Sequence, residues 1–171
     1  MTFVLGIDPG LSGALVVTNG ADKIAVWEMP VSNYGKEKEV SFQKTILLLK
    51  RIKAEFGFLH TYLERAMPLA MGSKHAFNYG RGFQTLILAL EITKFPTTLV
   101  EPQKWAKEMH QGISQDLKPK AKSLIAVQRL YPRLIKGLPV KKTGSIHDGY
   151  LDALLIAGFG LRRLGHSLDF Y

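Results

Sequence analysis

Residues 3–17 read FVLGIDPGLSGALVV, two short apolar runs on either side of a turn rich in glycine and proline. This pattern predicts two adjacent strands in the middle of a sheet, with one carboxylate, Asp8, at the end of the first. An unpaired charge there is costly to desolvate, so Asp8 needs a partner, and a metal ion is the leading candidate. Alternatively, Asp8 only begins the Asp-Pro-Gly turn, where aspartate is common. This segment alone leaves both interpretations open.

Size and composition narrow the possibilities. The chain has 171 residues, enough for one domain with its own core, and it contains no cysteine. Without thiolates, a metal ion would have to bind carboxylates or histidine, which favours hard cations such as Mg²⁺ or Mn²⁺. No apolar run approaches the roughly 20 residues of a membrane span, and no leader pattern precedes residue 3. We therefore expect a soluble, cytoplasmic protein with no membrane contact.

The chain is strongly basic, with a formal net charge of +9. Residues 102–142 hold ten lysines and arginines but only two acids, so this segment alone carries a net charge of +8. Such a charge predicts a polyanionic partner, either nucleic acid or an acidic membrane surface. Scattered lysines are often no more than a solvated face, but the uneven distribution favours nucleic acid.

The rest of the chain predicts alternating strands and helices from its apolar periodicity and its breakers. Gly57 and Pro132 are the expected stops of two of the helices. The expected elements, in order, are strand 23–29, polar loop 33–39, helix 40–56, strand 60–64, loop 65–75, helix 76–93, strand 97–100, a short helix from 102, polar loop 111–119, helix 120–131, basic linker 133–145 and a last helix containing 148–157.

Three more acids stand out. Glu64 ends the strand at 60–64, although on its own an exposed glutamate at a strand end would be ordinary. Asp148 and Asp152 lie four residues apart, which puts both on one face of the last helix near its start. Acids in the first turns of a helix favour its dipole by about 0.3–1 kcal/mol each. Asp152, however, lies well inside an almost wholly apolar helix, where a metal ligand is the better explanation.

The loop at 65–75 is unusually apolar for a solvated connection. Its apolar residues are Met67, Leu69 and Met71. They either pack against the core or contact DNA bases, and the sequence leaves both possibilities open.

The helix at 76–93 contains two glycines, Gly80 and Gly82. Each would cost about 1 kcal/mol in a helix interior relative to alanine, so something must approach that backbone closely. A helix of a second subunit and a DNA strand both qualify, and a local kink is the alternative. The broad apolar face of this helix is expected to comprise Phe77, Phe83, Leu86, Ile87 and Leu90.

The expected order of elements is that of an RNase H-like fold: three antiparallel strands, then helix, strand, helix, strand and C-terminal helices. This is an α/β fold with a mixed five-stranded sheet, three strands antiparallel and two parallel, and helices on both faces. At this point the chain resembles the RuvC family of Holliday junction resolvases. The motifs that carry the resemblance are Gly6-Ile7-Asp8-Pro9-Gly10, Leu63-Glu64, Gly80-Arg81-Gly82, Glu101-Pro102 followed by Lys107, Lys122-Ser123 and Asp152-Ala153-Leu154-Leu155-Ile156-Ala157.

The resemblance implies a single nuclease domain over residues 1–171. As a homodimer it would nick opposed strands of a four-way DNA junction symmetrically with the help of a divalent metal. By the same resemblance, Asp8, Glu64 and Asp152 would be metal ligands, and Lys107 and Lys122 would lie along the phosphate path near the cut. Lys122 is thus also a catalytic candidate. The full set of expected DNA-contacting residues is Met67, Lys74, Arg81, Lys104, Lys107, Lys118, Lys120 and Lys122.

The chain departs from the family pattern in three places, one of which is a longer charged insert around Lys36 to Glu39. Bacterial members have an acid or histidine three residues before the last aspartate, where this chain has Gly149. Asp148, four residues before, and His147 are the substitutes, and we take Asp148 as the fourth ligand. The family's aromatic residue after the strand glutamate is replaced near Met67. These three departures are typical of a phage or other divergent branch, so we expect the protein in a bacterial cell or a phage-infected host.

The chemistry of phosphodiester hydrolysis also explains these acids, independently of the family resemblance. Phosphodiester hydrolysis needs a deprotonated water on one side and a neutralised leaving alkoxide on the other, and two hard cations about 3.5–4 Å apart supply both. We therefore expect two Mg²⁺ or Mn²⁺ ions per active site, with Asp8 between them, and products with 5′-phosphate and 3′-hydroxyl ends.

Three other functions remain to be weighed. The chain could be a RuvC-like nuclease for flaps or other branched DNA, or a non-catalytic scaffold that binds junctions. The presence of all four acids argues against the scaffold. An actin-like ATPase domain also ends its first strand in a Gly-Ile-Asp-x-Gly pattern. It would need a second such domain and a nucleotide cleft, which 171 residues can hardly provide.

Overall fold

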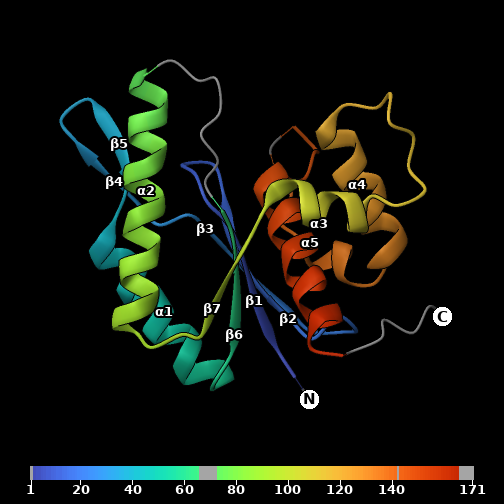
Figure 1. Ribbon diagram of the computed structural model, residues 1–171, viewed down its shortest axis with the longest axis horizontal. Coiled ribbons are helices and arrows are strands. Elements are labelled where there is room, and N and C mark those ends of the chain that lie inside the picture. Colours follow the sequence, from blue (N-terminus) through green and yellow to red (C-terminus); the bar gives the residue numbers. More distant parts are fainter. Residues whose placement is uncertain (1, 66–72, 142, 166–171) are drawn as a thin grey trace.

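One mixed sheet between two layers of helices makes up the computed structural model, which describes residues 2–65, 73–141 and 143–165 (Figure 1). The strands lie in the order β3-β2-β1-β6-β7, with β1 to β3 antiparallel and β6 and β7 parallel to β1. This arrangement confirms the expected α/β class and RNase H-like fold. The strands are β1 Val4–Asp8, β2 Ala14–Thr18, β3 Ile24–Glu28, β6 His60–Glu64 and β7 Thr97–Val100.

The first helical layer consists of α1 Phe42–Phe56 and α2 Ser73–Ile92, and it covers one face of the sheet (Figure 1). Helix α1 begins after Ser41, whose side chain accepts a hydrogen bond from the Lys44 N–H, and ends at Gly57, as the sequence predicts. The layer packs on inward-facing apolar side chains of the strands. The largest fully buried members of this core are Leu5, Ile7, Leu15, Leu49, Ile52, Leu59, Leu63, Leu86 and Leu90.

The second layer covers the opposite face with α5 Asp148–Arg163, and α3 Pro102–Met109 and α4 Pro119–Leu130 pack on the outer side of α5 (Figure 1). Helix α5 is buried along most of its length, which explains why its sequence is apolar all round rather than on one stripe. Within the described residues, no helix is long and apolar enough to cross a membrane.

Two glycines bring α5 into close contact with β1 and its turn. A Cβ atom on Gly6 would lie 2.2 Å from the Ala153 carbonyl oxygen, so only glycine lets the backbones of β1 and α5 approach this closely. A Cβ on Gly149 would lie 2.5 Å from the carbonyl oxygen of Ser12 in the β1–β2 turn. These contacts hold the start of α5, which carries two of the acids, against the end of the strand that carries Asp8.

The segment predicted as polar loop 33–39 is instead part of a β-hairpin, formed by β4 Val31–Tyr34 and β5 Glu37–Val40. Strand prediction missed it because the central pairs of this hairpin join polar residues, such as Ser32 with Glu39, and only the outermost pair, Val31 with Val40, is apolar. The basic linker 133–145 also holds structure, a 3₁₀ helix η1 at Leu134–Gly137.

Helix α2 differs from its prediction in three respects. It begins at Ser73 rather than residue 76. The close approach expected at its glycines is made at Gly82 by the chain's own hairpin, because a Cβ there would lie 3.0 Å from a methyl group of Val40. No described atom lies within 4 Å of a Cβ on Gly80. Phe77 is not on the buried face: it is 64% exposed, with the Arg81 guanidinium 5.5 Å from its ring centroid.

Candidate active site

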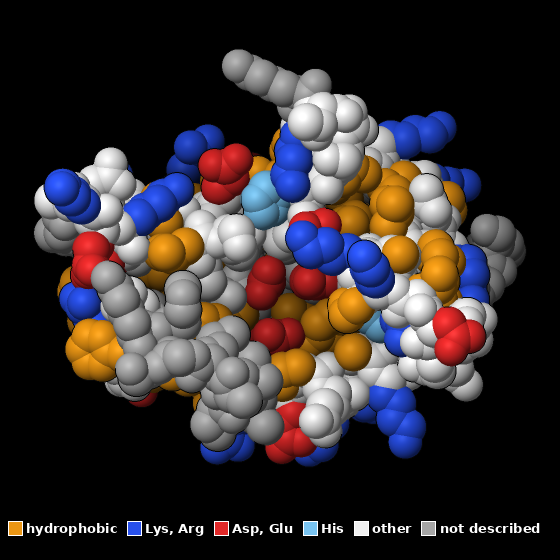
Figure 2. All heavy atoms as spheres, turned by 90° about the horizontal axis from the view of Figure 1, so that it is seen from above, with side chains coloured by type: hydrophobic (Ala, Val, Ile, Leu, Met, Phe, Trp, Pro, Cys, Tyr) orange, Lys and Arg blue, Asp and Glu red, His pale blue; other side chains and the backbone are white. Residues whose placement is uncertain are grey.

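Four acidic residues gather at one end of the sheet. Ile7 of β1 is in register with Leu63 of the parallel neighbour β6, so the next residues, Asp8 and Glu64, leave adjacent strands at the same level. Asp148 and Asp152 come from the start of α5, which packs against this end of β1. Viewed onto this end, Figure 2 shows acidic side chains on the floor of a hollow, with lysine and arginine side chains on its rim.

The carboxylates share one electrostatic environment. The pKa of Asp8 is raised well above its ordinary value by burial, and further by the negative charges of Asp152, Glu64 and Asp148. Burial raises the pKa of Glu64 to about 7, against the lowering effect of a hydrogen bond from Trp105 and with an added contribution from Asp152. Burial and mutual repulsion thus both disfavour the ionised carboxylates, and a bound cation would favour them.

Asp152 behaves in the same way. Burial raises its pKa to about 6, a hydrogen bond from Ser123 lowers it, the charge of Asp148 raises it and the charge of Lys120 lowers it. Asp152 therefore interacts electrostatically with both the acidic site and the basic helix α4, and it lies at the boundary between them.

Three of the acids are each held by one partner from the second helical layer. The Trp105 Nε1–H of α3 donates to Glu64 Oε2 at 2.7 Å, and the Ser123 hydroxyl of α4 donates to Asp152 Oδ1 at 2.6 Å. Lys120 of α4 forms an ion pair with Asp148 Oδ2 at 2.6 Å. In each of these contacts one carboxylate oxygen is used, which leaves the second oxygen of the same carboxylate for another ligand.

The donor set suits a hard divalent cation, which prefers carboxylate oxygens. However, no group of three or more His, Asp or Glu side chains in the described part of the chain is close enough to hold a metal ion as the side chains stand. The mutual pKa effects indicate neighbouring charges rather than a formed coordination shell. The contacts from Trp105, Ser123 and Lys120 each fix one oxygen of an acid, so a cation would have to draw the free oxygens together.

The Asp152 contact continues into a short relay. Ser123 Oγ lies 3.3 Å from His110 Nε2, and both residues are buried. Because Ser123 donates its only proton to Asp152, its oxygen accepts from His110, which places a proton on Nε2. The His110 ring meets the Trp105 ring edge to face at 5.6 Å, so the partners of Glu64 and Asp152 support each other.

Tyr79 is the point at which α2 reaches the site from the other layer. Its ring lies 3.9 Å from the position of a Cβ on Gly10, in the turn after Asp8. The pKa of its hydroxyl is raised by burial and by the charges of Glu64 and Asp8. Tyr79, Trp105 and His110 carry no local sequence signal that predicts a role in the site, and Ser123 is notable in the sequence only as part of the Lys122-Ser123 motif.

Gly149 and His147 explain how the start of α5 departs from the family pattern. A side chain at position 149 would collide with the β1–β2 turn, so an acid at that position has no room in this chain. His147 Nδ1 accepts the N–H of Gly149 at 3.2 Å and caps the helix. Asp148 is the remaining candidate for a fourth carboxylate, and its role as a ligand stays a prediction.

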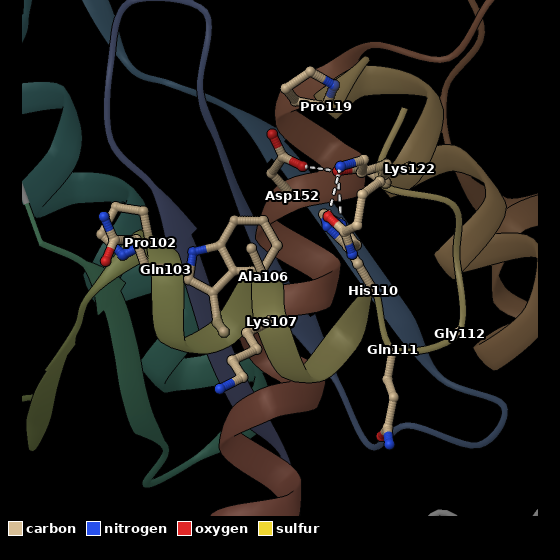
Figure 3. Close-up of a pocket in the computed structure, with 13 residues that line it drawn as sticks. Pro102, Gln103, Ala106, Lys107, His110, Gln111, Gly112, Pro119, Lys122 and Asp152 are labelled. Carbon is tan, nitrogen blue, oxygen red and sulfur yellow. Dashed lines mark hydrogen bonds between the residues drawn. The ribbon is translucent and has the colours of Figure 1, made fainter. Parts of the chain in front are cut away.

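The expected DNA-contacting lysines of the second layer lie around the acids. Lys122 donates to Gln115 at 3.0 Å, and both Lys107 and Lys122 line a cavity of about 740 Å³ between α3 and α4 that reaches Asp152 (Figure 3). Lys118 is exposed immediately before α4. Lys120, already paired with Asp148, is exposed as well.

The other expected DNA contacts are less closely tied to the acids. Arg81 on α2 forms an ion pair with Glu39 of the hairpin at 2.7 Å, and Lys104 pairs with Glu101 at 3.4 Å. Met67 lies outside the described residues. Lys74 lies in α2, but its side chain is likewise outside the described part.

Fold and site together define an RNase H-like domain with an acidic centre. The chain is similar in structure to RuvC of Thermus thermophilus in complex with a Holliday junction substrate, with a TM-score of 0.63, 15% sequence identity and coverage of 96% of this chain and 97% of that one. A second structure of T. thermophilus RuvC gives a TM-score of 0.57 at the same identity and coverage. The yeast mitochondrial Holliday junction resolvase Ydc2 gives 0.57 at 15% identity, over 98% of this chain and 82% of that one. No protein-family model and no curated protein sequence matches the chain.

Proposed function

We propose that this chain is a divalent-metal-dependent endonuclease that resolves four-way DNA junctions by paired, symmetrical nicks, with residues 1–171 as one nuclease domain. One observation carries the proposal: Asp8, Glu64, Asp148 and Asp152 come from three elements that meet at one end of a RuvC-like sheet, and their charges raise one another's pKa values. One of the similar solved structures is described as a complex with a Holliday junction substrate, which supports the substrate class.

The proposed site uses the four carboxylates to hold two Mg²⁺ or Mn²⁺ ions. Bound there, such ions supply a deprotonated water on one side of the phosphodiester and neutralise the leaving oxygen on the other, which yields 5′-phosphate and 3′-hydroxyl ends. Trp105 and Ser123 orient Glu64 and Asp152 through their hydrogen bonds. Lys122 lies near Asp152 and adds positive charge beside the phosphate that is cut.

Basic residues supply affinity for the DNA backbone. Residues 102–142 carry a net charge of +8, and within this segment Lys120 of α4 contacts Asp148. Each phosphate contact releases counterions, so junction binding should weaken steeply with salt. Replacing Lys122 with alanine should reduce cutting with at most a modest loss of binding.

Paired nicks require two active sites, so we propose a homodimer. Phe77, Leu88 and Ile92 of α2 are exposed, and spacings of eleven and four residues put them on the same side of the helix. No atom of the described residues lies within 4 Å of a Cβ on Gly80, which leaves room for a partner on this side of the helix. A C2 dimer through α2 would present two equivalent acidic sites to the two halves of a junction.

The test is to compare cleavage of a synthetic four-way junction, a 5′ flap, a 3′ flap and a linear duplex of matched sequence, each with Mg²⁺. The proposal predicts that the junction is cut at least about tenfold faster than the others. Faster cutting of flaps would favour the broader nuclease. Tight junction binding without cutting in Mg²⁺ or Mn²⁺ would favour the scaffold.

A further inference from the structure

We propose that His110 is a positioning residue that couples Glu64 to Asp152, so that the cation-binding geometry of one acid depends on that of the other. This inference rests on the proposed function and deepens it, because it adds a residue that acts on the acids only through their partners. His110 follows the last residue of α3, and only 9% of its surface is exposed.

The first arm of the coupling runs from His110 through Ser123 to Asp152. His110 Nε2 lies 3.3 Å from Ser123 Oγ, and the Ser123 hydroxyl donates to Asp152 Oδ1 at 2.6 Å (Figure 3). A serine hydroxyl has one proton and can rotate about its Cβ–Oγ bond. An N–H donated to Oγ by His110 disfavours the rotamers that turn this proton away from Asp152. His110 therefore fixes the direction in which Ser123 donates.

The second arm runs from His110 through Trp105 to Glu64. The edge-to-face contact of the two rings has a centroid distance of 5.6 Å and an interplanar angle of 75°. The indole Nε1–H of Trp105 donates to Glu64 Oε2 at 2.7 Å. Because the indole ring is rigid, any rotation of the ring moves its N–H. The His110 ring limits this rotation and so limits the movement of the donor to Glu64.

The two arms join helices that are otherwise separated by a cavity. Helices α3 and α4 each pack on α5, and the cavity of about 740 Å³ between them is lined by Trp105, His110 and Ser123. Helices on either side of such a space could shift independently of each other. His110 links them at the level of the two side chains that hold acids.

Packing alone does not require a histidine at this position. An apolar ring would meet Trp105 without the desolvation cost of a buried imidazole. What histidine adds is the N–H for Ser123, and a satisfied hydrogen-bond network in a buried site rigidifies it. The choice of side chain thus favours a role in positioning.

The experiment measures Mg²⁺ affinity by titration calorimetry. His110→Phe keeps a ring beside Trp105 but lacks the N–H, and it should weaken Mg²⁺ binding by about 3- to 10-fold. This is less than the roughly 10- to 100-fold for a direct partner of a metal ligand, because His110 acts one step further out. His110→Gln supplies an amide N–H in place of Nε2–H and should bind Mg²⁺ more tightly than His110→Phe. A merely structural role would give no such rescue.

A double substitution tests the route to Asp152. With Ser123→Ala already present, His110→Phe should weaken Mg²⁺ binding by less than about twofold further, because its path to Asp152 is gone. Independent residues would instead show the same factor in both backgrounds.

His60→Phe is the matched control. His60 Nε2 also lies within hydrogen-bonding distance of a hydroxyl, 2.8 Å from Thr98 Oγ1, and its ring lies 5.0 Å from that of Tyr62. However, it stands at the start of β6, whereas Glu64 stands at its end. His60→Phe should leave Mg²⁺ affinity unchanged.

Nuclear magnetic resonance tests the coupling without metal or DNA. The chain has two tryptophans, Trp27 and Trp105, so two indole N–H resonances are expected. Ser123→Ala should shift the resonance of Trp105 and leave that of Trp27 in place. In a His110→Ala background, Ser123→Ala should shift neither resonance.

The outcomes separate the two proposals. If His110→Phe binds Mg²⁺ like wild type, if the two substitutions act independently, or if Ser123→Ala leaves the Trp105 resonance in place, the coupling is overturned and the nuclease stands. If His110→Phe misfolds, the Trp105 resonance in Ser123→Ala decides. If Mg²⁺ binding depends on His110 as expected but no branched DNA is cut, the coupling stands and the nuclease fails. If wild type binds no Mg²⁺, both proposals fail.

Discussion

The two helical layers of this molecule treat the acidic site differently. The α1–α2 layer closes one face of the sheet with an ordinary aliphatic core, and its described contribution to the site is the Tyr79 ring near the turn after Asp8. The α3–α5 layer supplies two of the four acids and holds three of them through Trp105, Ser123 and Lys120. The contacts that hold the acids therefore come from the α3–α5 layer, while the α1–α2 layer mainly packs against the sheet.

This asymmetry also separates Asp8 from the other acids. Glu64, Asp148 and Asp152 each have a donor from α3 or α4. Asp8 lies between the layers, and the negative charges of the other three acids add to burial in raising its pKa. In the proposed site, a carboxylate in that position would be suited to act as a bridge between two cations. We therefore expect substitution of Asp8 to have the largest effect on cutting. Substitution of the residues that hold the other acids should have a smaller effect, and substitution in the opposite layer the smallest.

Asp8→Asn should have the largest effect. It should lower the rate of junction cutting by more than about a thousandfold, because the metal-borne stabilisation of the transition state amounts to several kcal/mol and each 1.36 kcal/mol is tenfold in rate. Single-turnover cleavage measures the loss, and gel shift should show unchanged junction binding. Asp22→Asn, an exposed acid in the β2–β3 turn, is the control. Wild-type rates for Asp8→Asn would show that the bridge is misassigned.

The stability of the protein should depend on Mg²⁺ and pH together. Because the folded-state pKa values of Glu64 and Asp152 are raised, their contribution to stability is full below about pH 4 and is lost as pH rises through about 6 to 7. The raised pKa of Asp8 acts in the same direction. Saturating Mg²⁺ offsets the repulsion between the ionised acids. At a fixed Mg²⁺ concentration of about a hundred times the Kd near pH 8, Mg²⁺ should raise the Tm by about 5–10 °C near pH 8 and by little near pH 5.

Thermal melts at both pH values, with and without Mg²⁺, measure this coupling. Asp8→Asn should raise the Tm of the metal-free protein near pH 8, because it removes one of the repelling charges, and it should reduce the response to Mg²⁺. An equal Mg²⁺ response at both pH values would argue against a shared carboxylate site.

Ser123→Ala should weaken Mg²⁺ binding and cutting by about 10- to 100-fold, the usual effect of removing a group that orients a metal ligand. Its fold should remain intact, and Ser123→Thr should restore much of the loss because it keeps the hydroxyl. Thr85→Ala is the matched change in the opposite layer, where the hydroxyl donates only to the Arg81 carbonyl. Titration calorimetry measures the Mg²⁺ affinity of both variants. Similar losses of affinity would contradict the claim that the two layers contribute differently to the site.

Two glycine substitutions should act in opposite directions on stability. Gly6→Ala would push β1 away from α5 and should lower the free energy of unfolding by about 1–3 kcal/mol or more. Gly80→Ala meets open space in the interior of α2 and should raise it by about 0.4–1 kcal/mol. Urea unfolding measures both. A destabilised Gly80→Ala monomer would mean that the helix needs this glycine for its own conformation.

The sequence was sufficient for the sheet and for the acids at its strand ends. The short apolar runs that end in Asp8 and Glu64 predict buried strands, which the structure contains. Asp152 stands out because an acid is unusual within an apolar helix. The β4–β5 hairpin lacked this signal because its central pairs join polar residues. Local pattern thus predicts elements that bury apolar side chains and misses those that do not.

The supports of the site could not be read from local pattern. Trp105 and Glu64 are 41 residues apart, and Ser123 and Asp152 are 29 apart, so these pairs exist only after the sheet and the second layer assemble. Gly149 is a similar case: its side-chain space is filled by a turn more than a hundred residues away in the sequence. Only tertiary packing explains why the acid stands at position 148.

The most direct measurement is to map the cuts on a four-way junction with each of its four strands labelled in turn, in Mg²⁺ and in EDTA. We predict nicks at symmetrically related positions on two opposed strands, which DNA ligase reseals directly because the ends are 5′-phosphate and 3′-hydroxyl. We predict no nicks in EDTA or with Asp8→Asn. Nicks that persist under either condition, or cuts on one strand only, would contradict a paired, metal-dependent site built on these four acids.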